Sequence, residues 1–134
     1  MYGIGETVEF LATELVSAPA HVAEALQLEP DSQVIRRARR LLNADGRPIE
    51  LSTSWFAGTL AERAPRLLER ERLVGGTARY LAEVTGRHAA YGRDQVAARI
   101  ATEEETELLQ LDEPAAVLVR IHCLRRRRPA DADR

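Results

Sequence analysis

The stretch VIRRARRLLNADGRPIELSTSWF, residues Val34–Phe56, decides the fold that the sequence predicts. Two runs rich in β-branched and aromatic residues flank Asn43–Gly46, which is followed by Pro48. Asp and Gly tolerate the positive φ of a tight turn, and Pro suits the start of a returning strand. The sequence therefore predicts a long β-hairpin with a short polar loop.

Four arginines crowd the outgoing strand of this hairpin. Because side chains alternate along a strand, Arg37 and Arg39 share one face, and Arg36 and Arg40 share the other. At least one pair must point toward whatever covers the sheet, where guanidinium groups need an anion or internal carboxylates. The alternative is an edge strand or a solvated face, with arginine stems lying over apolar surface. The hairpin alone leaves both interpretations open.

Composition limits the class of protein. The chain has 134 residues, of which 45% are hydrophobic and 30% charged, as is typical of one soluble globular domain. A net charge of −2 excludes an overall basic field that would attract nucleic acid. The single cysteine, Cys123, excludes an internal disulfide and a cysteine-based metal cluster. No apolar run approaches the roughly 20 residues of a membrane span, and no secretory signal is present, so we expect a cytoplasmic protein.

Patterns on both sides of the hairpin predict further strands and helices. Thr7–Val16 alternates as a strand, with Val8, Phe10, Ala12 and Val16 on one face. Antiparallel strands with helices between them indicate an α+β fold. The other predicted elements are a helix over Pro19–Leu28 with Ser17 available as a cap, helical turns over Ala57–Arg72 broken at Pro65, a helix over Thr77–Val84 with Thr77 as N-cap, a strand within Ala90–Ile100, a capping-box helix from Thr102 to Leu109, and a strand over Ala115–Leu124.

The search for catalytic or metal-binding patterns leaves a binding site as the best hypothesis. The sequence has no nucleophile elbow, phosphate loop or dinucleotide fingerprint. Its three histidines lack metal-ligand spacing, so we expect no metal site and no cofactor. The arginine-bearing hairpin and the glycine-led helix start at Gly75-Gly76-Thr77 suit a pocket for a small anionic or polar molecule. The residues support binding and not catalysis.

Several strings in this order resemble the UTRA domain, the effector-binding module of GntR-type bacterial regulators of the HutC subfamily. They are ELVSAPAHVAEALQL, RRARRLLNADGRPIELSTSWF, GGTARYLAEVTG and VAARIATEEETELLQLDEPAAVLVRIHCL, and they cover roughly residues 6–124. The resemblance implies a chorismate lyase-like fold, an antiparallel sheet with helices packed around a ligand pocket. It also implies a homodimer that senses a small effector, such as a phosphorylated sugar or an organic acid.

The resemblance also implies a set of ligand-binding residues. Arginines on the first hairpin strand bind the anionic part of the effector in such domains, and Arg37 and Arg39 occupy that strand here. The polar positions of the returning strand are Ser52 and Ser54. Thr77 holds the hydroxyl position at the helix start, and Arg79 stands where relatives usually have an aromatic residue.

Further expectations concern the ends of the chain and other activities. The winged helix-turn-helix of such regulators is not in this chain, so DNA would be bound only through a domain outside it. RRRRPADADR, residues 125–134, stands where the family continues with another turn and strand, and we expect a basic, disordered tail. Two alternatives remain: a chorismate lyase-like enzyme, which needs a buried carboxylate opposite the arginines, and a purely structural dimerisation module.

Overall fold

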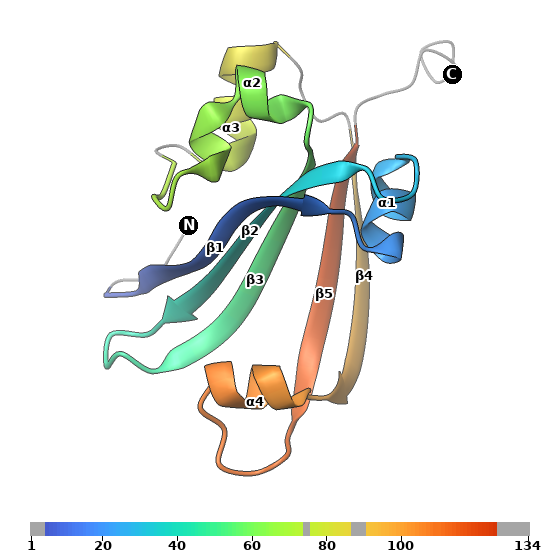
Figure 1. The fold of residues 1–134 in the computed structure, drawn as a ribbon. Coiled ribbons are helices and arrows are strands. Elements are labelled where there is room, and N and C mark those ends of the chain that lie inside the picture. Colours follow the sequence, from blue (N-terminus) through green and yellow to red (C-terminus); the bar gives the residue numbers. More distant parts are fainter. Residues whose placement is uncertain (1–4, 74–75, 87–90, 126–134) are drawn as a thin grey trace.

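The computed structural model describes residues 5–73, 76–86 and 91–125. The order of its elements is the order that the sequence predicts, as Figure 1 shows. The predicted tail at 126–134 lies outside the described residues. The elements are β1 (Thr7–Ser17), α1 (Ala20–Leu26), β2 (Gln33–Leu42), β3 (Pro48–Ala57), α2 (Leu60–Arg63), the 3-10 helix η1 (Pro65–Leu68), α3 (Thr77–Thr85), β4 (Tyr91–Ile100), α4 (Glu103–Leu108) and β5 (Ala116–Arg125).

The predicted hairpin is present as β2 and β3, paired antiparallel from Val34↔Ala57 to Leu42↔Pro48. Its turn closes with the backbone N–H of Gly46 donating to the carbonyl of Asn43 at 2.9 Å. The Asn43 side chain also accepts from the backbone N–H groups of Asp45 and Arg47. Asn43 therefore contributes to the turn through both its carbonyl and its side chain, as Asn commonly does.

The strands of the described residues form two antiparallel sheets, with β1–β2–β3 in one and β4–β5 in the other. The sequence predicted an antiparallel sheet with helices around it, and the α+β class is confirmed. Figure 1 shows α4 at the end of the β4–β5 hairpin where β4 passes into β5. This division leaves much of the second hairpin outside the core.

Each face of the three-stranded sheet packs against its own apolar cluster. On one face Ile35 is fully buried with Leu67 of η1 and Tyr80 of α3. On the other face Val34 is fully buried against Val22 of α1. Because Arg37 and Arg39 alternate in phase with Ile35, they lie on the face that α2, η1 and α3 cover.

The predicted faces of β1 were wrong, because the strand contains a β-bulge. The register shifts between Phe10 and Ala12, so Phe10 pairs with Arg39 while Ala12 pairs with Ala38. Strict alternation predicted Phe10, Ala12 and Val16 on one face. The extra residue reverses the phase, because a bulge places two residues opposite one. Phe10 consequently shares the face of Arg37 and Arg39, and Val16 packs on the α1 side.

Two predicted helix caps are also corrected. The N-cap of α1 is Pro19 without a side-chain cap, and the hydroxyl of Ser17 instead donates to Asp31. The N-cap of α3 is Gly76, which has a φ of 92°, and Thr77 is the first helical residue. Glycine occupies this position because a side chain is strained at positive φ. No helix among the described residues is long and apolar enough to span a membrane.

The predicted capping box of α4 is confirmed. Thr102 accepts from the backbone N–H of Glu105, whose carboxylate accepts from the backbone N–H of Thr102. Arg99 of β4 donates to both oxygens of the same carboxylate, at 2.7 and 2.9 Å. These contacts, with that of Arg99 first, lower the pKa of Glu105 to about 2. Glu105 therefore joins the end of β4 to the first turn of α4.

This pairing predicts a stability difference that depends on pH. The folded-state pKa of Glu105 is below its unfolded value, so its contribution is present above about pH 4.3 and is lost as the pH falls toward 2. Glu105→Gln should lower the urea midpoint at pH 7. The midpoints of the variant and of the unmodified protein should converge near pH 2.5. Thr102→Ala, which removes a neutral cap worth ~1 kcal/mol, should keep its deficit down to pH 4. A pH-independent effect of Glu105→Gln would contradict this assignment.

Candidate ligand-binding site

The predicted site residues on the hairpin come together on one face. The register pairs Arg37 with Ser54 and Arg39 with Ser52. One terminal nitrogen of Arg39, Nη2, donates to the hydroxyls of both Ser52 and Ser54 at 2.8 Å. We call Arg39, Ser52 and Ser54 the Arg39 cluster. The cluster is partly buried, so it combines a positive charge with hydroxyl groups at the margin of the core.

Arg37 is 2% exposed and lies beneath the segment 66–71, which crosses this face of the sheet. Its Nη1 donates to the carbonyls of Arg66, Leu67 and Glu69, at 3.3, 2.6 and 3.0 Å. Its Nη2 donates to the carbonyl of Glu71 at 3.0 Å. These four carbonyls satisfy a buried charge with dipoles, which is the role that an anion or carboxylate was expected to fill. The prediction that Arg37 contacts an effector remains a prediction; its hydrogen bonds to these carbonyls hold the segment 66–71 in place.

Residues of β1 fasten the same segment from the other side. The hydroxyl of Thr13 donates to the carbonyl of Leu68 at 2.8 Å. Arg70 reaches back to the carbonyls of Phe10 and Leu11, at the bulge. The Arg37 guanidinium also lies 5.0 Å from the centre of the Phe10 ring, within range of a cation–π interaction. The bulge thus supplies both the ring and the carbonyls that position this segment.

Two acidic side chains of the segment, Glu69 and Glu71, are exposed. Glu69 and Glu71 both form ion pairs with Arg66, at 3.8 and 3.3 Å. A hydrogen bond between the two carboxyl groups raises the pKa of Glu69 and lowers that of Glu71. The segment therefore presents carbonyls inward to Arg37, while Arg66, Glu69 and Glu71 pair with one another at its surface.

The outer pair of arginines behaves differently. Arg36 forms an ion pair with Glu14 of β1 at 3.0 Å and lies 6.0 Å from the ring centre of Trp55. Arg40 pairs with Glu9 and donates to the carbonyl of Leu108 of α4 at 2.9 Å. The ion pair of Arg36 is partly exposed. Arg40 links β2 to α4 through its hydrogen bond to Leu108. These positions agree with the alternation read from the sequence.

The other two predicted site residues, Thr77 and Arg79, lie on α3 and not on the hairpin. Thr77 is half-buried at the first position of the helix. Arg79 has 70% of its side chain exposed and pairs with Glu83 one turn along, at 3.1 Å. This ion pair is a surface helix contact of the usual i,i+4 kind. The geometry supports Arg39, Ser52 and Ser54 as one group more strongly than it supports Arg79.

A family model for the UTRA domain matches residues 2–134. The chain belongs to the UTRA domain family. Solved structures agree with this fold, among them a putative regulator from Escherichia coli at 21% identity and a TM-score of 0.75, covering 92% of this chain and 87% of that one. The ligand-binding domain of a putative GntR-family regulator from Bordetella bronchiseptica has 21% identity and a TM-score of 0.71, covering 94% and 78%.

A third solved structure has the same fold. The C-terminal domain of a histidine utilization repressor from Pseudomonas syringae has 22% identity and a TM-score of 0.68, covering 87% of this chain and 80% of that one. No curated protein matches the sequence. The family model confirms the predicted UTRA family, and the solved structures confirm the predicted fold.

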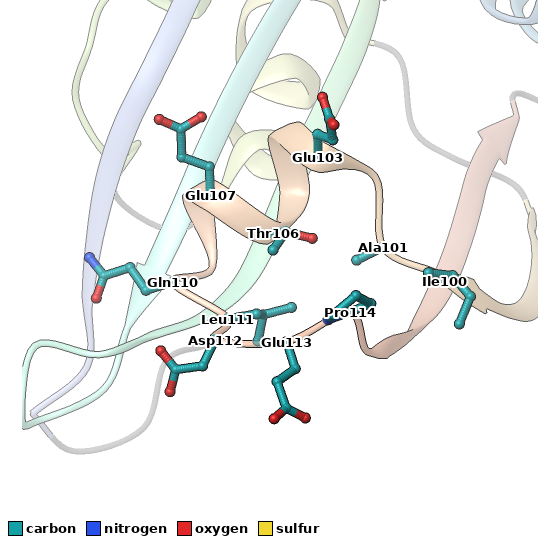
Figure 2. Close-up of a pocket in the computed structure, with 10 residues that line it drawn as sticks. All are labelled: Ile100, Ala101, Glu103, Thr106, Glu107, Gln110, Leu111, Asp112, Glu113 and Pro114. Atoms are coloured by element: carbon teal, nitrogen blue, oxygen red, sulfur yellow. The ribbon is translucent and has the colours of Figure 1, made fainter.

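A separate hollow lies beside α4 of the UTRA domain (Figure 2). Its volume is roughly 630 Å³, and among the described residues that line it none is one of the six predicted ligand-binding residues. Apolar side chains, including Ile100, Leu111 and Pro114, meet a rim of acidic ones. The acidic members are Glu103, Glu107, Asp112 and Glu113. Negative charge disfavours an anionic effector there, so the hollow is distinct in chemistry from the Arg39 cluster.

Proposed function

We propose that this UTRA domain is the effector-binding and dimerisation part of a GntR/HutC-type transcriptional regulator. It binds a small anionic metabolite, such as a phosphorylated sugar or an organic acid. Binding is coupled to DNA recognition by a winged-helix domain outside these residues, in the cytoplasm. The solved relative from Bordetella bronchiseptica is described as a ligand-binding domain of such a regulator, which supports this role.

The observation that carries the proposal is the Arg39 cluster. One guanidinium nitrogen engages two serine hydroxyls, and each hydroxyl keeps its own hydrogen to donate to a ligand. A planar guanidinium with adjacent hydroxyl donors suits a carboxylate or phosphate. Thr77 at the start of α3 is the further hydroxyl that we assign to this site. Arg37 supports the site by holding the segment 66–71 over the same face of the sheet.

Coupling to DNA follows from a difference in affinity between two arrangements of the dimer. An effector shifts the relative placement of attached domains only if it binds one arrangement more tightly than the other. The segment 66–71 and α3 both pack on the face that carries the Arg39 cluster. An anion at that cluster would therefore act on elements that are far apart in sequence.

Thermal-shift screening followed by calorimetry tests the proposal directly. The panel contains phosphorylated sugars, organic acids and amino-acid catabolites, with inorganic phosphate as the simplest probe. We expect at least one anion to raise the melting temperature and to bind with one site per chain. Failure of every member to bind the folded protein would overturn the sensor proposal. Release of pyruvate from chorismate, which we do not expect, would favour the enzyme alternative.

A further inference from the structure

One face of the β4–β5 hairpin exposes large apolar side chains to solvent. Val96, Ile100 and Leu118 have exposed fractions of 62%, 63% and 76%. The register pairs Ala98 with Leu118 and Ile100 with Ala116, so all of these residues lie on one face. We call this face, with Val96, Ala98, Ile100, Ala116, Leu118 and Arg120, the Leu118 face. Adjacent exposed apolar residues of this size are typical of an interaction site.

The opposite face of the hairpin is more covered. Val117 and Val119 of β5 are half-buried, whereas Leu118 and Arg120, which alternate with them, are exposed. On β5 the face that carries Val117 and Val119 is therefore the more covered of the two. Ile121 on the opposite face is itself 54% exposed, but the three most exposed large apolar side chains of the hairpin lie on the Leu118 face.

Charge is distributed along the Leu118 face in one direction. At the α4 end, Ile100 also lines the hollow whose rim carries Glu103, Glu107, Asp112 and Glu113 (Figure 2). Toward the other end, Arg120 is exposed and pairs in register with Val96. The apolar residues between these ends are centred on the Ala98–Leu118 pair. The face therefore has acidic residues beside its α4 end and apolar residues at its centre, with Arg120 beyond them.

We propose that the Leu118 face binds the same face of a second copy, with the two hairpins antiparallel about a two-fold axis at Leu118. This inference rests on the proposed dimerisation role and specifies its surface and orientation. The axis places Leu118 against its own counterpart and Val96 against Ile100 of the partner subunit. It also places Arg120 against the end of β5 that follows Asp112 and Glu113. A parallel arrangement would instead bring the two acidic ends together, which is unfavourable.

The hairpin face alone is smaller than a standard interface. A ten-residue, two-stranded hairpin presents a face of about 33 Å by 10 Å. That area falls short of the ~800 Å² that each partner contributes to a standard interface. The residues around the α4 hollow and Arg120 must therefore contribute, and only the antiparallel arrangement joins them with opposite charge.

The mass of the full chain in solution, measured by analytical ultracentrifugation, tests the surface. We expect twice the chain mass of 14.9 kDa for the unmodified protein and one chain for Leu118→Glu, which places two carboxylates on the axis. Ile121→Glu is the matched control, because Ile121 is 54% exposed on the opposite face and should leave the dimer intact. Circular dichroism checks that each variant is folded. A dimeric Leu118→Glu, a monomeric unmodified protein or a monomeric Ile121→Glu would overturn the assignment.

A charge exchange tests the orientation. Arg120→Glu and Glu113→Arg should each raise the dimer dissociation constant about tenfold, and the double variant should recover most of that loss. Absence of recovery would overturn the antiparallel arrangement. Binding of the effector hit or inorganic phosphate by the unmodified protein, whatever its mass in solution, would show that a failure here concerns the interface, and not the sensing role of the Arg39 cluster.

Discussion

Replacing Arg37 with alanine is expected to lower the free energy of unfolding by about 3–5 kcal/mol, more than we expect from any other single arginine substitution on β2. The substitution removes the donors of four hydrogen bonds and leaves the carbonyls of the segment 66–71 without them in the core. It also removes the cation–π contact with Phe10. Urea unfolding at pH 7 measures the effect.

Arg36→Ala is the matched control, because it removes the neighbouring arginine from the same strand. The ion pair of Arg36 with Glu14 is partly exposed, with side-chain exposures of 31% and 45%, so we expect a loss below ~1 kcal/mol. Arg37→Lys should fall between the two, since it keeps the charge but not the planar fork. Equal effects of Arg36→Ala and Arg37→Ala would show that the carbonyl contacts contribute little.

Arg39→Ala is expected to weaken effector binding by about 10- to 100-fold, because a hydrogen bond to a charged group contributes roughly 1.5–3 kcal/mol. Calorimetric titration with the best anion from the screen measures the dissociation constant. Stability should change less than for Arg37→Ala, because two of the contacts of Arg39 are to serine hydroxyls at the margin of the core. Ser52→Ala and Ser54→Ala should each give a smaller loss of affinity.

Arg79→Ala is the matched control for this measurement. Arg79 was predicted as a ligand-binding residue, yet its side chain is 70% exposed and pairs with Glu83. If the site is the Arg39 cluster, Arg79→Ala should leave the dissociation constant within about twofold, which is under 0.5 kcal/mol. A loss for Arg79→Ala equal to that for Arg39→Ala would instead assign α3 to the site.

Much of the fold followed from local chemistry. Asn43 and Gly46 fix the turn of the hairpin, and the spacing of Thr102 and Glu105 fixes the start of α4. Side-chain alternation separated Arg37 and Arg39 from Arg36 and Arg40. Each of these features depends on residues that are close in sequence, so the sequence pattern carries the information directly.

The bulge at Phe10 and Ala12 was not predictable in this way. It depends on the pairing of β1 with β2, which are separated by α1, and an alternating pattern does not reveal an inserted residue. The error moved Phe10 to the wrong face and concealed its contact with Arg37. The contact of Thr13 with the segment 66–71 and that of Arg70 with β1 were missed for the same reason. Each joins residues more than 50 positions apart in the sequence.

The sequence by itself determined that this chain has a hairpin with two pairs of arginines on opposite faces of one strand, and that a pair on an inner face needs partners. Only the tertiary structure decided what those partners are. Arg37 is satisfied by backbone carbonyls of the segment 66–71, whereas Arg39 is held by Ser52 and Ser54. The two side chains are equivalent in local sequence and strand phase. They differ because the segment packs over one and not the other, and such long-range packing leaves no trace in the pattern around each arginine.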